Sequence, residues 1–127
     1  MIAIDTSALM AIALNEPQAV ACMDVLVFED EVLISAGTLA EALIVSARRN
    51  VGEEVRQVLN NLRFRVVDVS YASALRAAEA YERWGKGRHP ARLNFGDCFA
   101  YEVAKYHSCR LLYVGRDFSQ TDIEGVL

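Results

Sequence analysis

Short apolar runs alternate along this chain with longer stretches whose apolar residues recur at helical spacing. The predicted strands are Ile2–Ile4, Val32–Ser35, Phe64–Val69 and Leu111–Val114. The predicted helices are Thr6–Leu14, Pro17–Phe28, Gly37–Arg49, Gly52–Asn61, Ser70–Trp84 and Phe95–His107. Strands that alternate with helices indicate a parallel sheet covered on both faces. We therefore expect one α/β domain over residues 1–127, with three α/β/α layers and a central, mainly parallel sheet of about four to five strands.

Two of these helices have apolar residues at helical spacing, which predicts the faces that pack on the core. In Gly37–Arg49 the predicted face consists of Ala40, Leu43, Ile44 and Ala47. In Ser70–Trp84 it consists of Ala74, Ala77, Ala78 and Tyr81. We also expect Tyr81, Trp84 and Tyr101 to be core or interface residues, although aromatic rings at these positions can stack on bases.

Composition excludes several classes of protein. A hydrophobic content of 54% with 24% charged residues is typical of a globular protein. The net charge of −4 argues against a protein that coats nucleic acid through bulk charge. The three cysteines form no CxxC or Cys/His pattern, which argues against zinc. No apolar run is long enough to cross a membrane, and the first residues lack the pattern of a signal peptide, so we expect a cytoplasmic protein with no membrane partner.

Four acids far apart in the sequence are predicted at one edge of the sheet. Asp5 ends the first strand, and Glu41 lies near the start of the helix after the second. Asp97 lies in the first turn of a helix that is apolar almost all round, and Asp117 follows the last strand closely. Right-handed crossovers bring the ends of parallel strands and the starts of the following helices to the carboxyl edge, where ligands bind in such folds.

Each of these acids also has an ordinary structural explanation. Asp5 can cap a helix, Glu41 can be a solvated helix residue and Asp117 can be a turn residue. Asp97 can cap its helix or interact with the helix dipole. Clustered carboxylates repel one another unless a cation neutralises them, however, and oxygen ligands without His or Cys favour Mg²⁺ or Mn²⁺. The four acids together therefore indicate chemistry on phosphates.

Four stretches of the chain resemble the PIN-domain ribonucleases, and most closely the VapC toxins of toxin–antitoxin pairs. They are Ile2–Ala8, Ser35–Glu41, Leu93–Tyr101 and Gly115–Ile123, of which the last two are the most specific. The resemblance implies that Asp5, Glu41, Asp97 and Asp117 are the catalytic, metal-holding quartet of a Mg²⁺-dependent ribonuclease, with Mn²⁺ as an alternative ion. It implies a supporting role for Thr6 or Ser7 and leaves Asp122 as a candidate peripheral acid.

The resemblance also implies further properties. Asp5 and Asp97 would be the central ligands, while Glu41 and Asp117 would complete the site directly or through water. Hydrolysis would leave a 5′-phosphate and a 3′-hydroxyl. The partners would be RNA, a cognate antitoxin that covers the acidic groove and a second copy of the chain in a homodimer. The sequence departs from the family at Arg116, where relatives commonly carry a small polar residue. This arginine can contact an RNA phosphate or compete with the metal for Asp117.

Positive charge gathers in the segment before the Asp97 helix. Lys86, Arg88 and Arg92 lie there together with His89, and the segment from Arg83 to Arg92 contains no acid. We expect a flexible loop. It is either a solvated loop or a rim that binds RNA phosphates together with Arg116.

Two other functions fit part of the pattern. A non-catalytic PIN-fold module that binds protein or RNA would tolerate loss of the acids, but all four are present. A phosphatase of the haloacid-dehalogenase type would need a second Asp two residues after Asp5, where the chain has Ser7. The metal-dependent ribonuclease toxin is therefore the favoured prediction.

Overall fold

A four-stranded parallel sheet forms the centre of the molecule, in a computed structural model that describes all 127 residues. The strands are β1 (Ile2–Ile4), β2 (Val32–Ser35), β3 (Phe64–Val67) and β4 (Arg110–Leu112), in the order β3-β2-β1-β4. The register pairs Ile2 of β1 with Val32 of β2 and with Arg110 of β4. The predicted α/β fold with a parallel sheet is confirmed, with four strands.

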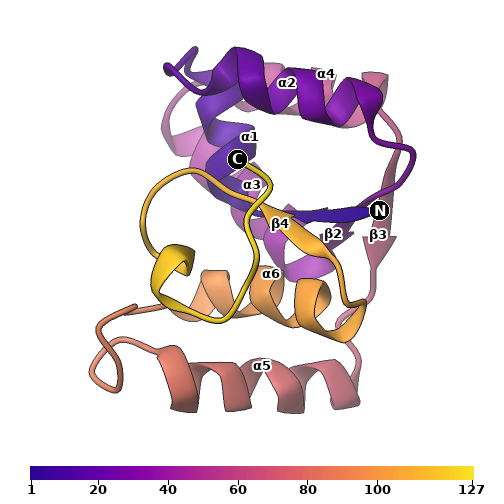
Figure 1. Cartoon of the computed structure of the whole chain (residues 1–127). Helices are drawn as coiled ribbons and strands as arrows, with labels where there is room; N and C mark the ends of the chain where they lie inside the picture. The colour runs from indigo at the N-terminus through magenta and orange to yellow at the C-terminus, as the bar shows by residue number, and fades with distance from the viewer.

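Helices cover both faces of this sheet (Figure 1). The helices are α1 (Thr6–Ala13), α2 (Ala19–Phe28), α3 (Ala36–Arg48), α4 (Gly52–Asn61), α5 (Tyr71–Trp84) and α6 (Phe95–Tyr106), and a short 3₁₀ helix, η1 (Phe118–Gln120), follows β4. In the view of Figure 1, α2 and α4 lie above the sheet, while α6 and then α5 lie below it. None of these helices combines the length and apolar character that a membrane crossing requires.

The two sides of the sheet bury two separate cores because successive strand residues point to opposite faces. Ile2 and Ile4 of β1 pack in the core shared with α1 and α2. Ala3 of the same strand packs in the core shared with α5 and α6. The central strands β1 and β2 are buried on both faces, which explains why they are almost entirely apolar rather than alternating, whereas the edge strand β3 is only partly buried.

Most predicted element boundaries agree with the structure within two residues. β2 and α4 have the predicted bounds, whereas β3 ends at Val67 and β4 covers residues 110–112. The second helix begins at Ala19 because residues 17 and 18 form a turn, and not at Pro17.

The predicted core face of α3 is wrong, and that of α5 is wrong except for Ala77, which is buried as predicted. In α3 the fully buried side chains are Thr38, Ala42 and Ser46, while Ala40, Ile44 and Ala47 are exposed and Leu43 is half-buried. In α5 the buried side chains are Ser73, Ala77, Ala80 and Trp84, while Ala74, Ala78 and Tyr81 are exposed. Both helices bury small hydroxyl residues. Ser46 Oγ donates to the carbonyl of Leu43 and Ser73 Oγ to that of Ser70, whereas Thr38 Oγ1 has no hydrogen-bond partner. Alanine is small enough to be tolerated on either face, so it did not discriminate between them.

Candidate functional site

Asp5 lies at the end of β1, where the chain turns into α1. It is the N-cap of that helix: its Oδ2 accepts hydrogen bonds from the backbone N–H of Ser7 at 3.0 Å and from Ser7 Oγ at 2.6 Å. The side chain is buried, and its other oxygen, Oδ1, has no hydrogen-bond partner. A buried carboxylate oxygen without a partner is costly, so this atom is a candidate ligand for a cation.

Ser7 connects Asp5 to the segment that follows β4. Its hydroxyl oxygen donates to Asp5 and accepts a hydrogen bond from the backbone N–H of Val114 at 3.0 Å. Asp5 is further tied to β4 because its own N–H donates to the carbonyl of Leu112 at 3.0 Å. The carboxylate is therefore fixed from two sides.

Glu41 reaches the same region from the second turn of α3. Thr6 Oγ1 donates a hydrogen bond to Glu41 Oε1 at 2.6 Å, so the residue after Asp5 orients this second acid. The carboxylate of Glu41 lies directly against Gly96, where a Cβ atom would overlap it. Gly96 is a site residue that sequence reasoning missed, since the requirement for a small residue comes from a side chain 55 positions away.

Asp97 enters the site from the first turn of α6. A reciprocal capping box holds it: Asp97 Oδ2 accepts from the N–H of Asn94 at 3.0 Å, and the Asn94 side chain accepts from the N–H of Asp97 at 2.9 Å. The predicted capping function is thus real, and it leaves Oδ1 of this buried carboxylate free of the cap.

Asp117 approaches from the loop after β4 and is exposed. It immediately precedes η1, whose first residue, Phe118, is buried and anchors the turn. The main chain therefore holds Asp117 at the rim while the other three acids lie deeper.

All four predicted acids line one cavity of about 190 Å³ at the carboxyl edge of the sheet. The lining residues are Asp5, Thr6, Ser7, Glu41, Val45, Asp97, Val114, Asp117 and Phe118. No three acidic side chains lie close enough to ligate a single ion directly. The donors are all oxygens, and the cavity offers the unpartnered Oδ1 of Asp5. This donor chemistry fits a hard divalent cation that keeps part of its water shell.

The acids affect each other's protonation. The pKa of Asp97 is raised to about 7, mainly by burial and also by the charges of Asp5, Asp117 and Glu41, against the opposing hydrogen bond from Asn94. Burial also raises the pKa of Asp5 to about 6, against the hydrogen bonds from Ser7 and with a contribution from Glu41. No lysine or arginine lines the cavity. The chain thus collects negative charge here without a cation of its own.

The predicted basic loop is a closed turn between α5 and α6. Backbone hydrogen bonds join Lys86 N to the carbonyl of Leu93 and Leu93 N to the carbonyl of Trp84, both within 3.0 Å. Lys86, Arg88 and Arg92 surround a polar hollow with Gly87, His89 and Pro90. Arg88 also pairs with Glu82 at 3.5 Å, in an exposed position. The prediction of a flexible loop did not anticipate these closing bonds.

Two further residues singled out in the sequence lie apart from the carboxylate cavity or at its edge. Arg116 is exposed in the loop beside Asp117 and forms no ion pair. Asp122 does not line the acidic cavity: it accepts a hydrogen bond from Tyr101 Oη at 2.6 Å and pairs with Lys105 at 3.2 Å. Trp84 Nε1 donates to the same Tyr101 oxygen at 3.0 Å, and both aromatic residues belong to the core as predicted, whereas Tyr81 is exposed.

Comparison with known proteins assigns the chain to a family. The family model described as "PIN domain" matches residues 2–124. The VapC ribonuclease Mb2004c of Mycobacterium bovis and the ribonuclease VapC36 of Mycobacterium tuberculosis are each 42% identical over 126 residues, covering 95% of this chain and 90% of the relative. The ribonuclease VapC of Mycolicibacterium smegmatis is 39% identical, covering 97% of this chain and 98% of the relative.

Solved structures share the fold at lower sequence identity. The toxin VapC20 of Mycobacterium tuberculosis, described as cleaving the sarcin-ricin loop, superposes with a TM-score of 0.80 at 19% identity, covering 99% of this chain and 98% of that one. A toxin–antitoxin complex from Klebsiella pneumoniae gives 0.71 at 17% identity, covering 96% of this chain and 93% of that one. The match over residues 2–124, together with relatives of about 40% identity along almost the whole length, shows that this chain belongs to the PIN-domain family and is similar to its VapC ribonucleases.

Proposed function

We propose that this protein is an endoribonuclease toxin of a type II toxin–antitoxin pair, acting on RNA phosphodiester bonds at the acidic cavity. The observation that carries the proposal is the meeting of Asp5, Glu41, Asp97 and Asp117 in one cavity at the carboxyl edge of the sheet. Relatives of about 40% identity named as VapC ribonucleases support the reaction class.

The proposed cofactor is Mg²⁺, with Mn²⁺ as an alternative. Asp5 and Asp97 would hold it most directly, since both are buried and Asp5 Oδ1 has no other partner. When bound, such an ion lowers the pKa of a water molecule and stabilises charge on the phosphate and the leaving oxygen. Mg²⁺ commonly binds through one or two carboxylates and keeps several waters, which suits acids that do not form a closed cage.

The remaining residues of the cavity have separate roles in this proposal. Thr6 orients Glu41 and Ser7 orients Asp5, so each acid keeps its position when the charges around it change. Exposed Asp117 closes the rim on the side where RNA would enter. Cleavage would leave a 5′-phosphate and a 3′-hydroxyl.

Positive charge for the RNA backbone would come from outside the cavity. Lys86, Arg88 and Arg92 face a hollow on the turn that leads into α6, and Arg116 lies beside Asp117. Phosphate contacts of this kind provide affinity without reading sequence.

The proposed assembly follows the relatives. We propose a single PIN domain over residues 1–127, a homodimer, and a complex with a cognate antitoxin that covers the acidic cavity, in the cytoplasm. The exposed apolar side chains of α2, among them Val20, Val27 and Phe28, offer surface to such partners.

A metal titration with two substrates tests the activity. Wild-type protein is incubated with a structured RNA and, separately, with a phosphomonoester, in EDTA and in increasing Mg²⁺ or Mn²⁺. We expect RNA cleavage only with metal, no monoester hydrolysis, and 5′-phosphate ends when the fragments are sequenced. Hydrolysis of the monoester alone would indicate a phosphatase and contradict the proposed nuclease. RNA binding without cleavage in any metal would favour a non-catalytic module.

A further inference from the structure

The first residue of α6 is an aromatic side chain left in solvent. Phe95 is 76% exposed, whereas the next three residues, Gly96, Asp97 and Cys98, are all buried. Nothing in the fold covers this ring, and burying a phenylalanine is favourable. Its position at the start of the helix that carries Asp97 calls for an explanation outside folding.

The ring is exposed but held in place. Phe95 packs edge-on against Phe99, with ring centroids 5.0 Å apart and planes at 88°. Phe99 in turn lies against Gly37 of α3, where an added Cβ would come within 2.7 Å of its Cγ. The second ring is therefore wedged between two helices and supports the first. A ring supported in this way loses little conformational entropy when another planar group stacks on it.

Phe95 also lies between the two charged features of the proposed site. Arg92 precedes it by three residues and Asp97 follows it by two, which limits the Cα separations to about 11 Å and about 7 Å. Residues two apart on a helix point to different sides. The ring therefore faces solvent while the carboxylate faces the cavity, and one nucleotide can span the two.

We propose that Phe95 is a stacking platform for one unpaired nucleobase of a single-stranded RNA, adjacent to the nucleotide whose phosphate enters the acidic cavity. The inference rests on the proposed function and specifies its substrate class. A nucleotide whose base is turned outward onto Phe95 leaves its phosphates free for the acidic cavity and for the basic turn formed by Lys86, Arg88 and Arg92. Bases inside a duplex are already stacked and cannot reach the ring, so the site selects loops and single strands.

Charge favours RNA over a protein as the occupant of this ring. The turn that precedes Phe95 presents Lys86, Arg88 and Arg92 around one hollow, which suits phosphates. Stacking is also indifferent to base identity because every base has a π-face, so the platform provides position rather than a sequence code.

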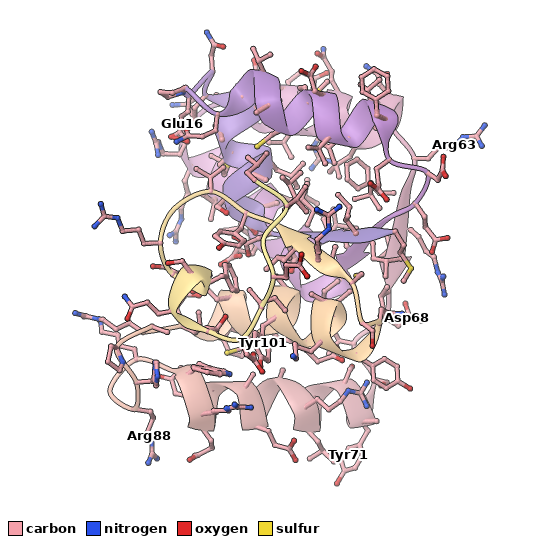
Figure 2. The ribbon with its side chains drawn as sticks, in the orientation of Figure 1. Glu16, Arg63, Asp68, Tyr71, Arg88 and Tyr101 are labelled. Carbon is pink, nitrogen blue, oxygen red and sulfur yellow. The ribbon has the colours of Figure 1, made fainter.

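A double-mutant cycle between protein and RNA tests the platform. The parent is the Asp97→Asn variant with Mg²⁺, which keeps the RNA intact. The probe is a fluorescein-labelled single strand of about 12 nucleotides, used complete and with one abasic site moved along it. Binding is followed by fluorescence anisotropy for the parent and for added Phe95→Leu, Phe95→Trp and Tyr71→Leu changes. Tyr71 is a control because it is 83% exposed and lies at the opposite end of α5 from Arg88 (Figure 2).

We expect Phe95→Leu to weaken binding roughly 5- to 100-fold, while Phe95→Trp and Tyr71→Leu bind as the parent does. An abasic site at one position should weaken the parent by a similar factor and leave the Phe95→Leu variant unaffected. Equal binding by Phe95→Leu, or abasic losses that are the same in both proteins, would overturn the platform.

Two outcomes separate this inference from the proposed function and from a protein interface. Salt-dependent RNA binding with no sensitivity to Phe95, alongside metal-dependent cleavage by the wild type, would reject the platform and keep the nuclease. Absence of both RNA binding and cleavage would reject the two together. If light scattering shows that Phe95→Leu dissociates a dimeric parent, the ring belongs to an interface between copies and the platform is rejected.

Discussion

Helix α6 carries two buried carboxylates whose surroundings differ completely. Asp97 is 7% exposed and Glu102 is 6% exposed. Glu102 Oε2 lies 2.9 Å from Arg76 Nε, and the same guanidinium lies over the ring of Tyr106 at 3.8 Å. Asp97 receives one backbone N–H at its side chain, and its charged neighbours are Asp5, Glu41 and Asp117.

The difference separates a carboxylate that supports the fold from one reserved for a ligand. A buried charge is tolerated when the chain supplies its partner, as Arg76 does for Glu102. Asp97 has no such partner, so its burial and, to a smaller extent, the neighbouring acids raise its pKa to about 7. An ionised carboxylate that is buried without a cation lowers the free energy of unfolding. A bound cation removes this destabilisation.

Replacing Asp97 with Asn gives the largest expected change in activity. Metal-dependent RNA cleavage should fall by about 100-fold or more, since a charged group at the centre of the cavity is lost. Thermal unfolding without metal should occur at the same or a higher temperature because a repelled charge has been removed. Asp24→Asn, an exposed acid on α2, is the matched control. Undiminished cleavage by Asp97→Asn would remove this residue from the proposed site.

Replacing Arg76 with Met should have the opposite effect, lowering the stability of the fold while leaving RNA cleavage close to wild type. Glu102 would be left buried without its cation, so the free energy of unfolding should fall by about 2–3 kcal/mol, somewhat less than for a fully buried pair because Arg76 is one-third exposed. Denaturant unfolding measures this loss, and cleavage at a temperature where the variant is folded should be close to wild type. A variant that lost activity but not stability would contradict the division between the two acids.

Gly96→Ala tests whether the position of Glu41 matters. The added methyl group would displace the Glu41 carboxylate, so cleavage should fall roughly 10-fold with little loss of stability. Gly52→Ala is the control, because the nearest atom to its added Cβ is 3.7 Å away. If the two alanine variants cleave RNA equally well, the contact between Glu41 and Gly96 has no role in the reaction.

The basic turn should act on RNA binding rather than on chemistry. Reversing Lys86 and Arg88 to Glu should raise KM roughly 3- to 10-fold, leave kcat close to wild type and flatten the salt dependence of cleavage. Arg63→Glu serves as the control, because Figure 2 shows Arg63 and Arg88 projecting from opposite sides of the molecule. An unchanged KM and an unchanged salt dependence would indicate that the turn is a solvated loop with no role in RNA binding.

The pH dependence of the free energy of unfolding should report the protonation of Asp5 and Asp97, which are buried without a cationic partner. In the native state the pKa of Asp5 is raised to about 6 and that of Asp97 to about 7, above the value of about 4 for the unfolded chain. The native state therefore binds these protons more tightly, and the resulting stabilisation is complete below about pH 4 and is lost as the pH rises through 6 and 7. Without metal, unfolding free energies should show this decline, and Asp97→Asn should make it shallower. Added Mg²⁺ should stabilise the wild type more at pH 8 than at pH 5, roughly as ionised carboxylates become available. A decline of the same size in both proteins would mean that Asp97 is not one of the groups responsible.

The sequence determined the layers, the parallel sheet and the edge at which the acids lie. Short apolar runs such as Ile2–Ile4 and Val32–Ser35 identify strands buried on both faces, and the handedness of their crossovers leaves one carboxyl edge. Asp5, Glu41, Asp97 and Asp117 all follow from that rule, and all line one cavity. Their roles as ligands and catalysts stay predictions, which the variants above address.

Only the tertiary structure decided which faces pack and which charges pair. Alanine and the hydroxyl residues are small enough for either face of a helix, so the sequence could not tell that Thr38 and Ser46 point inward while Ile44 points outward. The partnership of Arg76 with Glu102 and the contact of Glu41 with Gly96 join positions far apart in the chain. Such contacts depend on how closely two helices approach one another and at what angle. The local periodicity of the sequence contains no information about this packing.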